Sequence, residues 1–228
     1  MADSKLVTYE RYTKHCNTGR TLNGKTYTVD TITIHCTAGN ENSIAKNTID
    51  YFATTPNECG STYCIGGDGS IGQSTLEANR PWTSGGDKNV NGETGRINDY
   101  HAITIEVASD RNGTYVTDKA IAALINLVVD ICKRHGKTKA VWFGDDAKKM
   151  VAYQPAPNEM KFTWHRWFAS KACPGPYLMN HFQEIIDKVN EQLNPIESTV
   201  SEKPDNSSRA HEIMAQISAL LDELNKLI

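Results

Sequence analysis

The sequence predicts an α/β domain of about 190–200 residues followed by a separate C-terminal helix. Three observations lead to this prediction. Segments with strand-like alternation are interleaved with segments of helical spacing between residues 31 and 193. Residues 195–208 (PIESTVSEKPDNSS) then have the composition of a linker. Residues 209–228 return to a helical pattern, so we expect one domain (1–194), a linker (195–208) and one more helix.

The strands are predicted from β-branched, alternating segments. Residues 31–36 (TITIHC) and 102–108 (AITIEVA) are the clearest, and the second carries a single charge, Glu106. Residues 61–65 and 70–73 flank a Gly-Gly-Asp-Gly turn and therefore predict a hairpin. Residues 140–143 and 162–165 are shorter candidates.

Apolar residues three and four positions apart predict the helices. The pattern is strongest over residues 117–135 and also covers residues 177–193. A short helix is expected over residues 43–52, with Ser43 or Asn42 as its N-cap. Residues 79–99 are rich in Gly, Asn and Asp, so they predict a long loop, and long loops are often functional.

The last segment, residues 209–228, has a short heptad stripe. Its apolar residues step alternately by four and three positions: Ile213, Ile217, Leu220, Leu224 and Leu227. A helix of about 20 residues is marginal alone in water. It must therefore pack on the domain or on a second copy of itself, and a homodimer through residues 209–228 is one of these two alternatives.

Composition excludes some classes of function. The net charge of −3 and the pI near 6.2 argue against a nucleic-acid partner. There is no run of 18 apolar residues to span a membrane. The first residues, MADSKLVTYERYTKHC, lack the apolar core of a signal peptide, so we expect cytoplasmic synthesis, and any action outside the cell would follow release by another agent. The six cysteines form no CxxC pair, so reduced thiols are expected.

Two imidazoles and a thiol are the candidate metal ligands. His35 ends a predicted strand, which by itself is typical of an ordinary histidine. His165 and Cys173, however, lie eight residues apart in WHRWFASKACPGP, with Lys171 between them. Three such ligands with an open fourth position are typical of catalytic zinc.

Four segments in order carry a family resemblance. They are IHCTAG, YCIGGDGSIGQ, NDYHAITIEVAS and HRWFASKACPGP. Over residues 28–190 the chain resembles the type 2 N-acetylmuramoyl-L-alanine amidases, which include a phage lysozyme branch, a recycling-amidase branch and the peptidoglycan recognition proteins. The resemblance implies a central mixed β-sheet flanked by helices, with zinc in a cleft at one face of the sheet. It also implies hydrolysis of the amide between MurNAc and L-Ala in bacterial peptidoglycan, as in an endolysin of a clostridial phage or prophage.

The resemblance also assigns roles. His35, His165 and Cys173 match the zinc ligands of the family, and Lys171 matches a lysine that stabilises the oxyanion. Glu106 matches the general acid/base of the recycling branch. The phage lysozyme branch instead uses a tyrosine near the start of the hairpin, where this chain has Ser61 and Thr62. The role of the neighbouring Tyr63 stays open.

Several alternatives remain at this stage. The same chemistry fits a cytoplasmic enzyme that recycles soluble muropeptides, and the fold also fits a non-catalytic peptidoglycan recognition module. Trp82 is a candidate for stacking on sugar or peptide, and His101 a candidate for lining the cleft. The remaining histidines are expected at the surface: His15, His135, His181 and His211.

Overall fold

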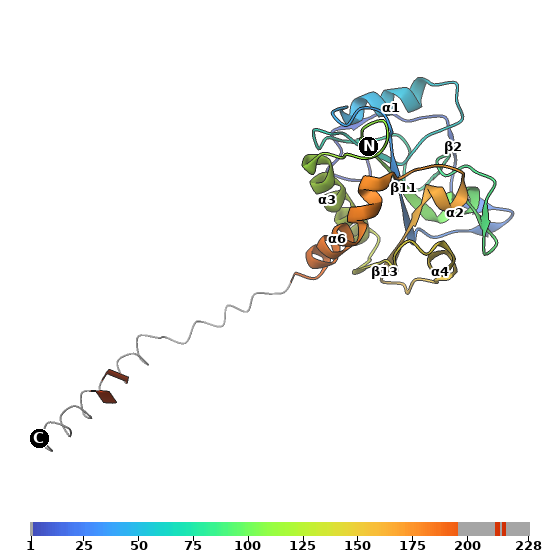
Figure 1. Cartoon of the computed structure of the whole chain (residues 1–228). Coiled ribbons are helices and arrows are strands. Elements are labelled where there is room, and N and C mark those ends of the chain that lie inside the picture. The colour runs from blue at the N-terminus through green and yellow to red at the C-terminus, as the bar shows by residue number, and fades with distance from the viewer. Residues whose placement is uncertain (1, 196–212, 215, 218–228) are drawn as a thin grey trace, which may run out of the picture. The chain divides into compact units, whose positions relative to one another are not determined.

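The computed structural model describes residues 2–195, 213–214 and 216–217 (Figure 1). The chain divides into two units, Met1–Asn194 and Pro195–Ile228. Most of the predicted linker and of the predicted helix 209–228 lies outside the described residues; the four described residues of that helix are helical. No helix in the described part of the chain has the length and apolarity to cross a membrane.

A seven-stranded mixed sheet forms the centre of the first unit, as predicted. Its strand order is β1-β7-β6-β11-β5-β13-β12. Only the β6–β7 hairpin pairs antiparallel; all other neighbours in this sheet are parallel. In spatial order the strands are β1 (Tyr9–Glu10), β7 (Ile71–Gln73), β6 (Tyr63–Ile65), β11 (Ala102–Val107), β5 (Thr31–Cys36), β13 (Glu159–Trp164) and β12 (Lys139–Val141).

The prediction of a plain loop over residues 79–99 is wrong. This segment contains β8, β9, β10 and the start of helix α2, because turn-rich polar sequence can still pair in short antiparallel ribbons. Thr94 begins α2 by accepting a hydrogen bond from the Ile97 amide. Within this segment β9 (Asn89–Val90) pairs with β10 (Glu93–Thr94), and β8 (Arg80–Pro81) pairs with the distant β2 (Cys16–Asn17). A third two-stranded ribbon, β3 (Thr21–Leu22) with β4 (Lys25–Thr26), lies outside the segment.

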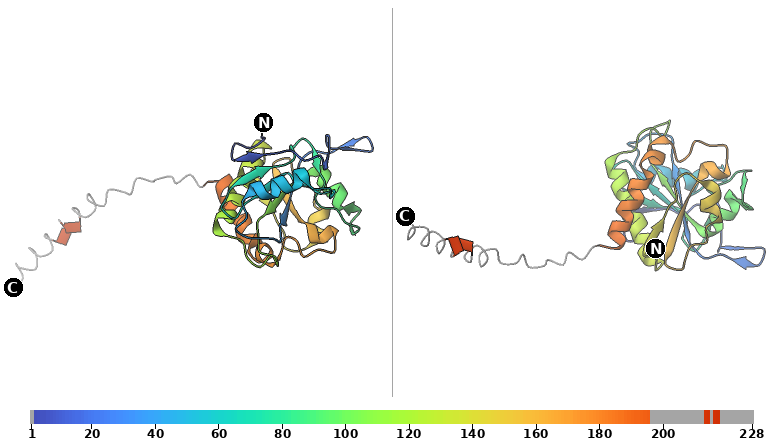
Figure 2. Two further views of the ribbon diagram at one scale, coloured as in Figure 1. Left: turned by 90° about the horizontal axis from the view of Figure 1, so that it is seen from above. Right: turned by 60° about the horizontal axis from the view of Figure 1, so that its bottom comes forward.

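Helices cover both faces of the sheet. α3 and α6 lie side by side (Figure 2) and pack on the face that carries Tyr63 and Ile65. The intervening residue Cys64 faces the other way, against α1. The helices are α1 (Ala45–Thr54), α2 (Gly95–His101), α3 (Asp118–Arg134), α4 (Ala147–Ala152), α5 (His165–Phe168) and α6 (Pro176–Leu193).

The start of α1 differs from the prediction. Its N-cap is Ile44, and neither Ser43 nor Asn42 takes that role. The Ala45 amide instead donates to the Ser70 hydroxyl at 3.0 Å, from the turn of the hairpin. The cap therefore comes from a residue distant in sequence, which no local capping pattern could reveal.

Alternation along β5 and β11 separates core from site. Ile32, Ile34, Ile103 and Ile105 belong to the apolar core shared with α3. The residues between them face the other side of the sheet, where polar side chains gather. Among these, the register pairs His35 with Glu106 at the carboxyl ends of the two strands. Open α/β sheets bind their ligands beyond this edge.

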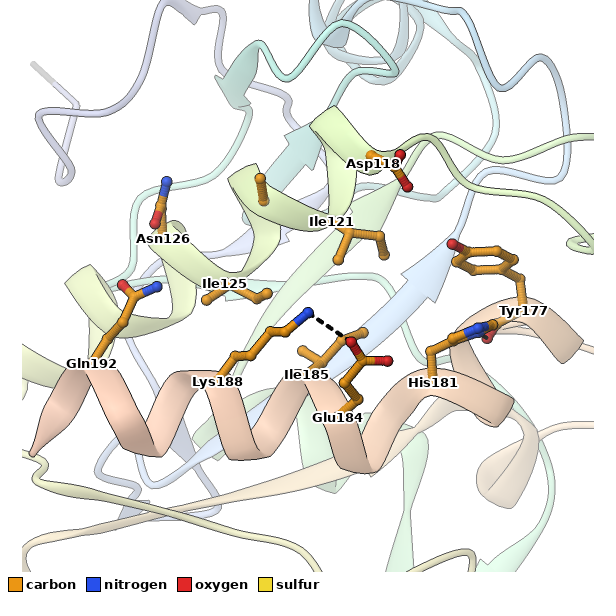
Figure 3. A pocket seen from close by; sticks show the side chains of 11 residues that line it. Asp118, Ile121, Ile125, Asn126, Tyr177, His181, Glu184, Ile185, Lys188 and Gln192 are labelled. Carbon is orange, nitrogen blue, oxygen red and sulfur yellow. Dashed lines mark hydrogen bonds and ion pairs between the residues drawn. The ribbon is translucent and has the colours of Figure 1, made fainter.

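A groove of about 380 Å³ lies between α3 and α6 (Figure 3). Ile121, Ile125 and Ile185 line it together with the ion pair between Lys188 and Glu184. None of the predicted site residues lines this groove, so the candidate site must be sought at the strand ends.

Candidate metal centre

His35, His165 and Cys173 converge at the carboxyl ends of β5 and β13. Their candidate ligand atoms all lie within 4.8 Å of one another. His35 is in β5, His165 begins α5 directly after β13, and Cys173 follows in the loop before α6. The register places Trp164 beside Ile34, so the next residue of each strand brings the two histidines together.

The spacing of these atoms fits zinc. The Sγ atom of Cys173 lies 3.5 Å from Nδ1 of His35. Zinc bonds of about 2.0–2.1 Å to nitrogen and about 2.3 Å to sulfur, at a tetrahedral angle, place the two ligand atoms about 3.5 Å apart. The separation of these two atoms therefore matches a tetrahedral zinc ion, and three protein donors leave one of its four positions open.

The outer nitrogen of each histidine has its own partner. Nε2 of His165 lies 3.1 Å from the carbonyl oxygen of Gly85, which can only accept, so Nε2 carries the proton. Nε2 of His35 lies 3.3 Å from the hydroxyl of Ser84. Both rings therefore present Nδ1 to the metal position. The Gly85 carbonyl fixes the tautomer of His165, and the Ser84 hydroxyl can accept from a protonated Nε2 of His35, as is usual for metal-binding histidines.

The electrostatic environment favours metal-binding forms. Burial, together with the nearby His165 ring, holds the pKa of His35 well below its ordinary value, and burial also lowers the pKa of His165. Both imidazoles are then neutral, as ligands must be. A hydrogen bond with Cys36 and burial raise the pKa of Cys173, so its thiolate needs a nearby cation. The Cys36 amide, 3.4 Å from that sulfur, donates to it.

Glu106 lies beside His35, and one of its carboxyl oxygens has no hydrogen-bond partner among the described residues. Its Oε1 is 3.9 Å from Nδ1 of His35, and its Oε2 is buried without a hydrogen bond to any described residue. Burial, and after it the Cys36 sulfur, raises the pKa of Glu106 well above the ordinary value. An unpaired buried carboxyl oxygen is costly, which favours a role for it at this centre.

Two of the donors, His165 and Cys173, line a cleft of about 450 Å³. Glu106 and Lys171 both line it, so the structure brings the two predicted catalytic residues into one cleft. Lys171 is exposed and lies near enough for its charge to contribute to the lowered pKa of His165. Arg111 also lines the cleft, on a turn in which the Asp110 carboxylate accepts from Thr114. No sequence motif pointed to this arginine.

The sequence left the roles of Tyr63, His101 and Trp82 undecided, and the first two lie away from the cleft. The Tyr63 hydroxyl donates to Glu77 at 2.6 Å on the α3 face of the sheet. His101 lies before β11, at the opposite end from Glu106, and its ring nitrogens meet Asp30 and Glu93. His101, one of the candidates for lining the cleft, does not line it, because the residue lies at the amino ends of the strands.

Trp82 remains close to the centre. It lines a second cavity of about 470 Å³ together with Gly85, whose carbonyl holds His165. Its Nε1 donates to Asn17 at 2.7 Å. His15, expected at the surface, is buried and bonded to the Thr55 carbonyl, so that expectation is wrong. The tertiary contact that buries His15 spans 40 residues, which local sequence does not show.

Comparison with protein families decides the class. Residues 25–176 match the family described as N-acetylmuramoyl-L-alanine amidase, and this range includes all three donors, Glu106 and Lys171. The chain belongs to this family. The amidase has no match among curated proteins.

Solved structures share its fold at low sequence identity. A mutant endolysin from Bacillus subtilis is 16% identical, covers 80% of this chain and 99% of its own, and has a TM-score of 0.51. The endolysin amidase LysCS from Clostridium intestinale URNW is 17% identical over 83% of this chain and 97% of its own, with a TM-score of 0.49. PlyL is 18% identical over 72% of this chain and 85% of its own, with a TM-score of 0.48. At these identities the first likeness establishes the fold alone.

Proposed function

We propose that this amidase is zinc-dependent and that His35, His165 and Cys173 hold the ion. The observation that carries the proposal is the convergence of the three donors, with Sγ of Cys173 3.5 Å from Nδ1 of His35, next to a cleft that Glu106 also lines. The substrate that follows from the family is peptidoglycan, cleaved between MurNAc and L-Ala. When bound, zinc supplies Lewis-acid chemistry that polarises the scissile carbonyl and acidifies a water molecule.

Glu106 is the proton carrier in this proposal. Its carboxylate accepts the proton of the attacking water and later delivers it to the departing alanine nitrogen. A carboxyl group can perform both steps when its pKa lies nearer to neutrality than usual, and the burial of Glu106 raises its pKa in that direction. A bound cation would oppose part of this rise.

Lys171 supports the developing charge. The scissile oxygen becomes negative at the tetrahedral stage, and a lysine ammonium on the wall of the same cleft stabilises that charge. Because Lys171 is exposed, water screens its charge, and its contribution is smaller than that of a buried donor.

The biological role proposed here is host lysis by a phage or prophage endolysin, of the clostridial type. The fold shared with an endolysin from Bacillus subtilis supports this role. In this reading the enzyme is retained in the cytoplasm of the producing cell and reaches the wall after release. A recycling amidase would use the same residues on soluble muropeptides, so the test must compare the two substrates.

The test is clearing of purified clostridial and Bacillus walls by the zinc-loaded protein, with new L-alanine amino termini and bound zinc quantified. We expect clearing, one zinc per chain and release of those termini. Cleavage of soluble muropeptides without clearing would replace the lytic role by recycling. A protein that binds no zinc and leaves both substrates intact would refute the proposal.

We also propose that residues 209–228 associate two chains. Support comes from the heptad stripe of the sequence. Sedimentation of the full chain should show a dimer that Ile217→Asp dissociates, whereas Ser218→Asp, one position away from the stripe, should not. A monomer at all concentrations would contradict this proposal.

A further inference from the structure

We propose that residues 83–85, anchored by Asp99, are the positioning shell of the metal centre and set its affinity for zinc. The inference rests on the zinc-dependent function proposed above. It assigns a role to Ser84 and Asp99, which are neither metal ligands nor the acid/base group in the proposed function.

Two consecutive residues of this segment each contact one of the two histidine ligands. The Ser84 hydroxyl meets Nε2 of His35 at 3.3 Å, and the Gly85 carbonyl meets Nε2 of His165 at 3.1 Å. These contacts span 49 and 80 residues of sequence. A single short segment therefore orients two rings that come from different strands.

Asp99 holds this segment in place. One carboxylate oxygen, Oδ2, accepts from the amides of both Thr83 and Ser84, at 3.0 and 2.9 Å. The side chain is inaccessible to solvent, and the Arg80 guanidinium lies 3.6 Å away to offset its charge. The hydroxyl of Thr83 adds a contact of 2.9 Å to that of Thr104 on β11.

The helix that carries Asp99 is itself locked to the strands. Asn98 donates to Thr33 of β5 and accepts from Thr163 of β13, both at about the length of a strong hydrogen bond, 2.8 and 2.9 Å. Arg20 donates to the carbonyls of Asp99 and Tyr100 in α2 and to that of Ala102, the first residue of β11. Segment 83–85 is therefore held, through α2, in a fixed position relative to β5 and β13, and His35 and His165 lie at the ends of these two strands.

Outer contacts of this kind fix ring orientation and tautomer before the ion arrives. Loss of such a partner typically costs about 10-fold to 100-fold in metal affinity or activity. At His35 the cost should be pronounced, because the ring is buried and Nε2 would be left without an acceptor when Ser84 loses its hydroxyl.

The experiment measures zinc affinity by chelator competition in the full chain. Ser84→Ala and Asp99→Ala should bind zinc about 10-fold to 100-fold more weakly than the wild type. Asp99→Asn keeps an acceptor oxygen and should recover most of the affinity. Ser74→Ala is the matched control, because Ser74 is equally buried but donates to the Ser61 carbonyl instead.

A second readout separates positioning from folding. Thermal unfolding of the metal-free proteins reports stability alone, and long-range 1H–15N NMR of the zinc-loaded proteins reports which imidazole nitrogen binds. We expect Nδ1 ligation with a protonated Nε2 at both histidines of the wild type, and a changed His35 signal in Ser84→Ala. If Asp99→Ala does not fold, Ser84→Ala and Asp99→Asn decide the question.

The outcomes are distinct. Zinc affinity within twofold of the wild type in Ser84→Ala, or an equal loss in Ser74→Ala, would overturn the positioning role while leaving the zinc-dependent function intact. Nε2 ligation at either histidine would overturn it as well. Failure of the wild type itself to bind zinc would refute the proposed function and this inference together.

Discussion

The two ends of β5 and β11 carry histidines in opposite states. At the carboxyl ends, His35 is buried beside another imidazole and has its pKa held well below the ordinary value. At the amino ends, burial alone would lower the pKa of His101, but hydrogen bonds and charges from Asp30 and Glu93 outweigh it and raise that pKa to about 9. The ring of His101 is therefore a cation near neutral pH.

The contrast shows what separates a reactive site from a structural one. His101 has both nitrogens engaged by carboxylates, and nearby Lys161 donates to the carbonyls of Val151 and Tyr153. The metal centre instead retains an unpaired Glu106 oxygen beside neutral donors. Similar residue types thus stabilise the fold at one end and leave binding capacity free at the other.

The largest effect should come from removing a donor. Cys173→Ser replaces the thiolate by a poor zinc ligand, so the protein should lose both its zinc and its activity on walls. Metal analysis and clearing assays check this. Cys16→Ser, at a half-buried thiol outside the centre, should retain both properties. Stoichiometric zinc in Cys173→Ser would remove the sulfur from the ligand set.

Glu106→Gln should separate binding from catalysis. The amide cannot accept the water proton, so activity should fall by about 10²–10⁴-fold while zinc content stays that of the wild type. Rates of L-alanine amino-terminus release measure this, with the exposed Glu191→Gln as control. A near-normal rate would transfer the proton-carrying role to another group.

His101 should govern the pH dependence of stability. Its folded pKa of about 9 lies above its ordinary value of 6.5, so its contribution is complete below about pH 6.5 and is lost as the pH rises through about 9. The contribution amounts to about 3 kcal/mol of unfolding free energy. Urea unfolding between pH 6 and pH 10 should show this decline in the wild type.

His101→Gln supplies the contrast for that measurement. The variant should be less stable at pH 6, and its difference from the wild type should shrink toward alkaline pH. His181→Gln, at an exposed histidine, should follow the wild type. If the difference in unfolding free energy between wild type and His101→Gln were the same at pH 10 as at pH 6, the charge on His101 would not be its source.

The smallest effect should come from Lys171→Ala. Removal of a buried oxyanion donor costs about 10²–10³-fold in rate, and solvent screening of this exposed lysine should reduce the loss to about 10-fold to 100-fold. Steady-state kinetics should place the loss in kcat more than in KM. Lys148→Ala, on the exposed side of α4, is the control, and an equal loss there would point to a general charge effect.

Much of the sheet and the donor residues could be predicted from local pattern. The alternation of residues 31–36 and 102–108 predicted both central strands, which the structure has at Thr31–Cys36 and Ala102–Val107. The helical spacing of residues 117–135 predicted α3, observed at Asp118–Arg134. Prediction failed where tertiary contacts override local composition. Residues 79–99 contain short strands and the start of α2, and the hydroxyl that accepts from the first amide of α1 belongs to Ser70 rather than Ser43.

The sequence by itself determined which side chains can bind a metal and that His35 and Glu106 each belong to a strand, because strand alternation is a local property. Only the tertiary structure decided that the register places Glu106 beside His35 and brings His165 to the same edge, since pairing depends on the packing of the whole sheet. It alone revealed the Ser84 and Gly85 contacts, because a backbone carbonyl and a serine distant in sequence carry no motif.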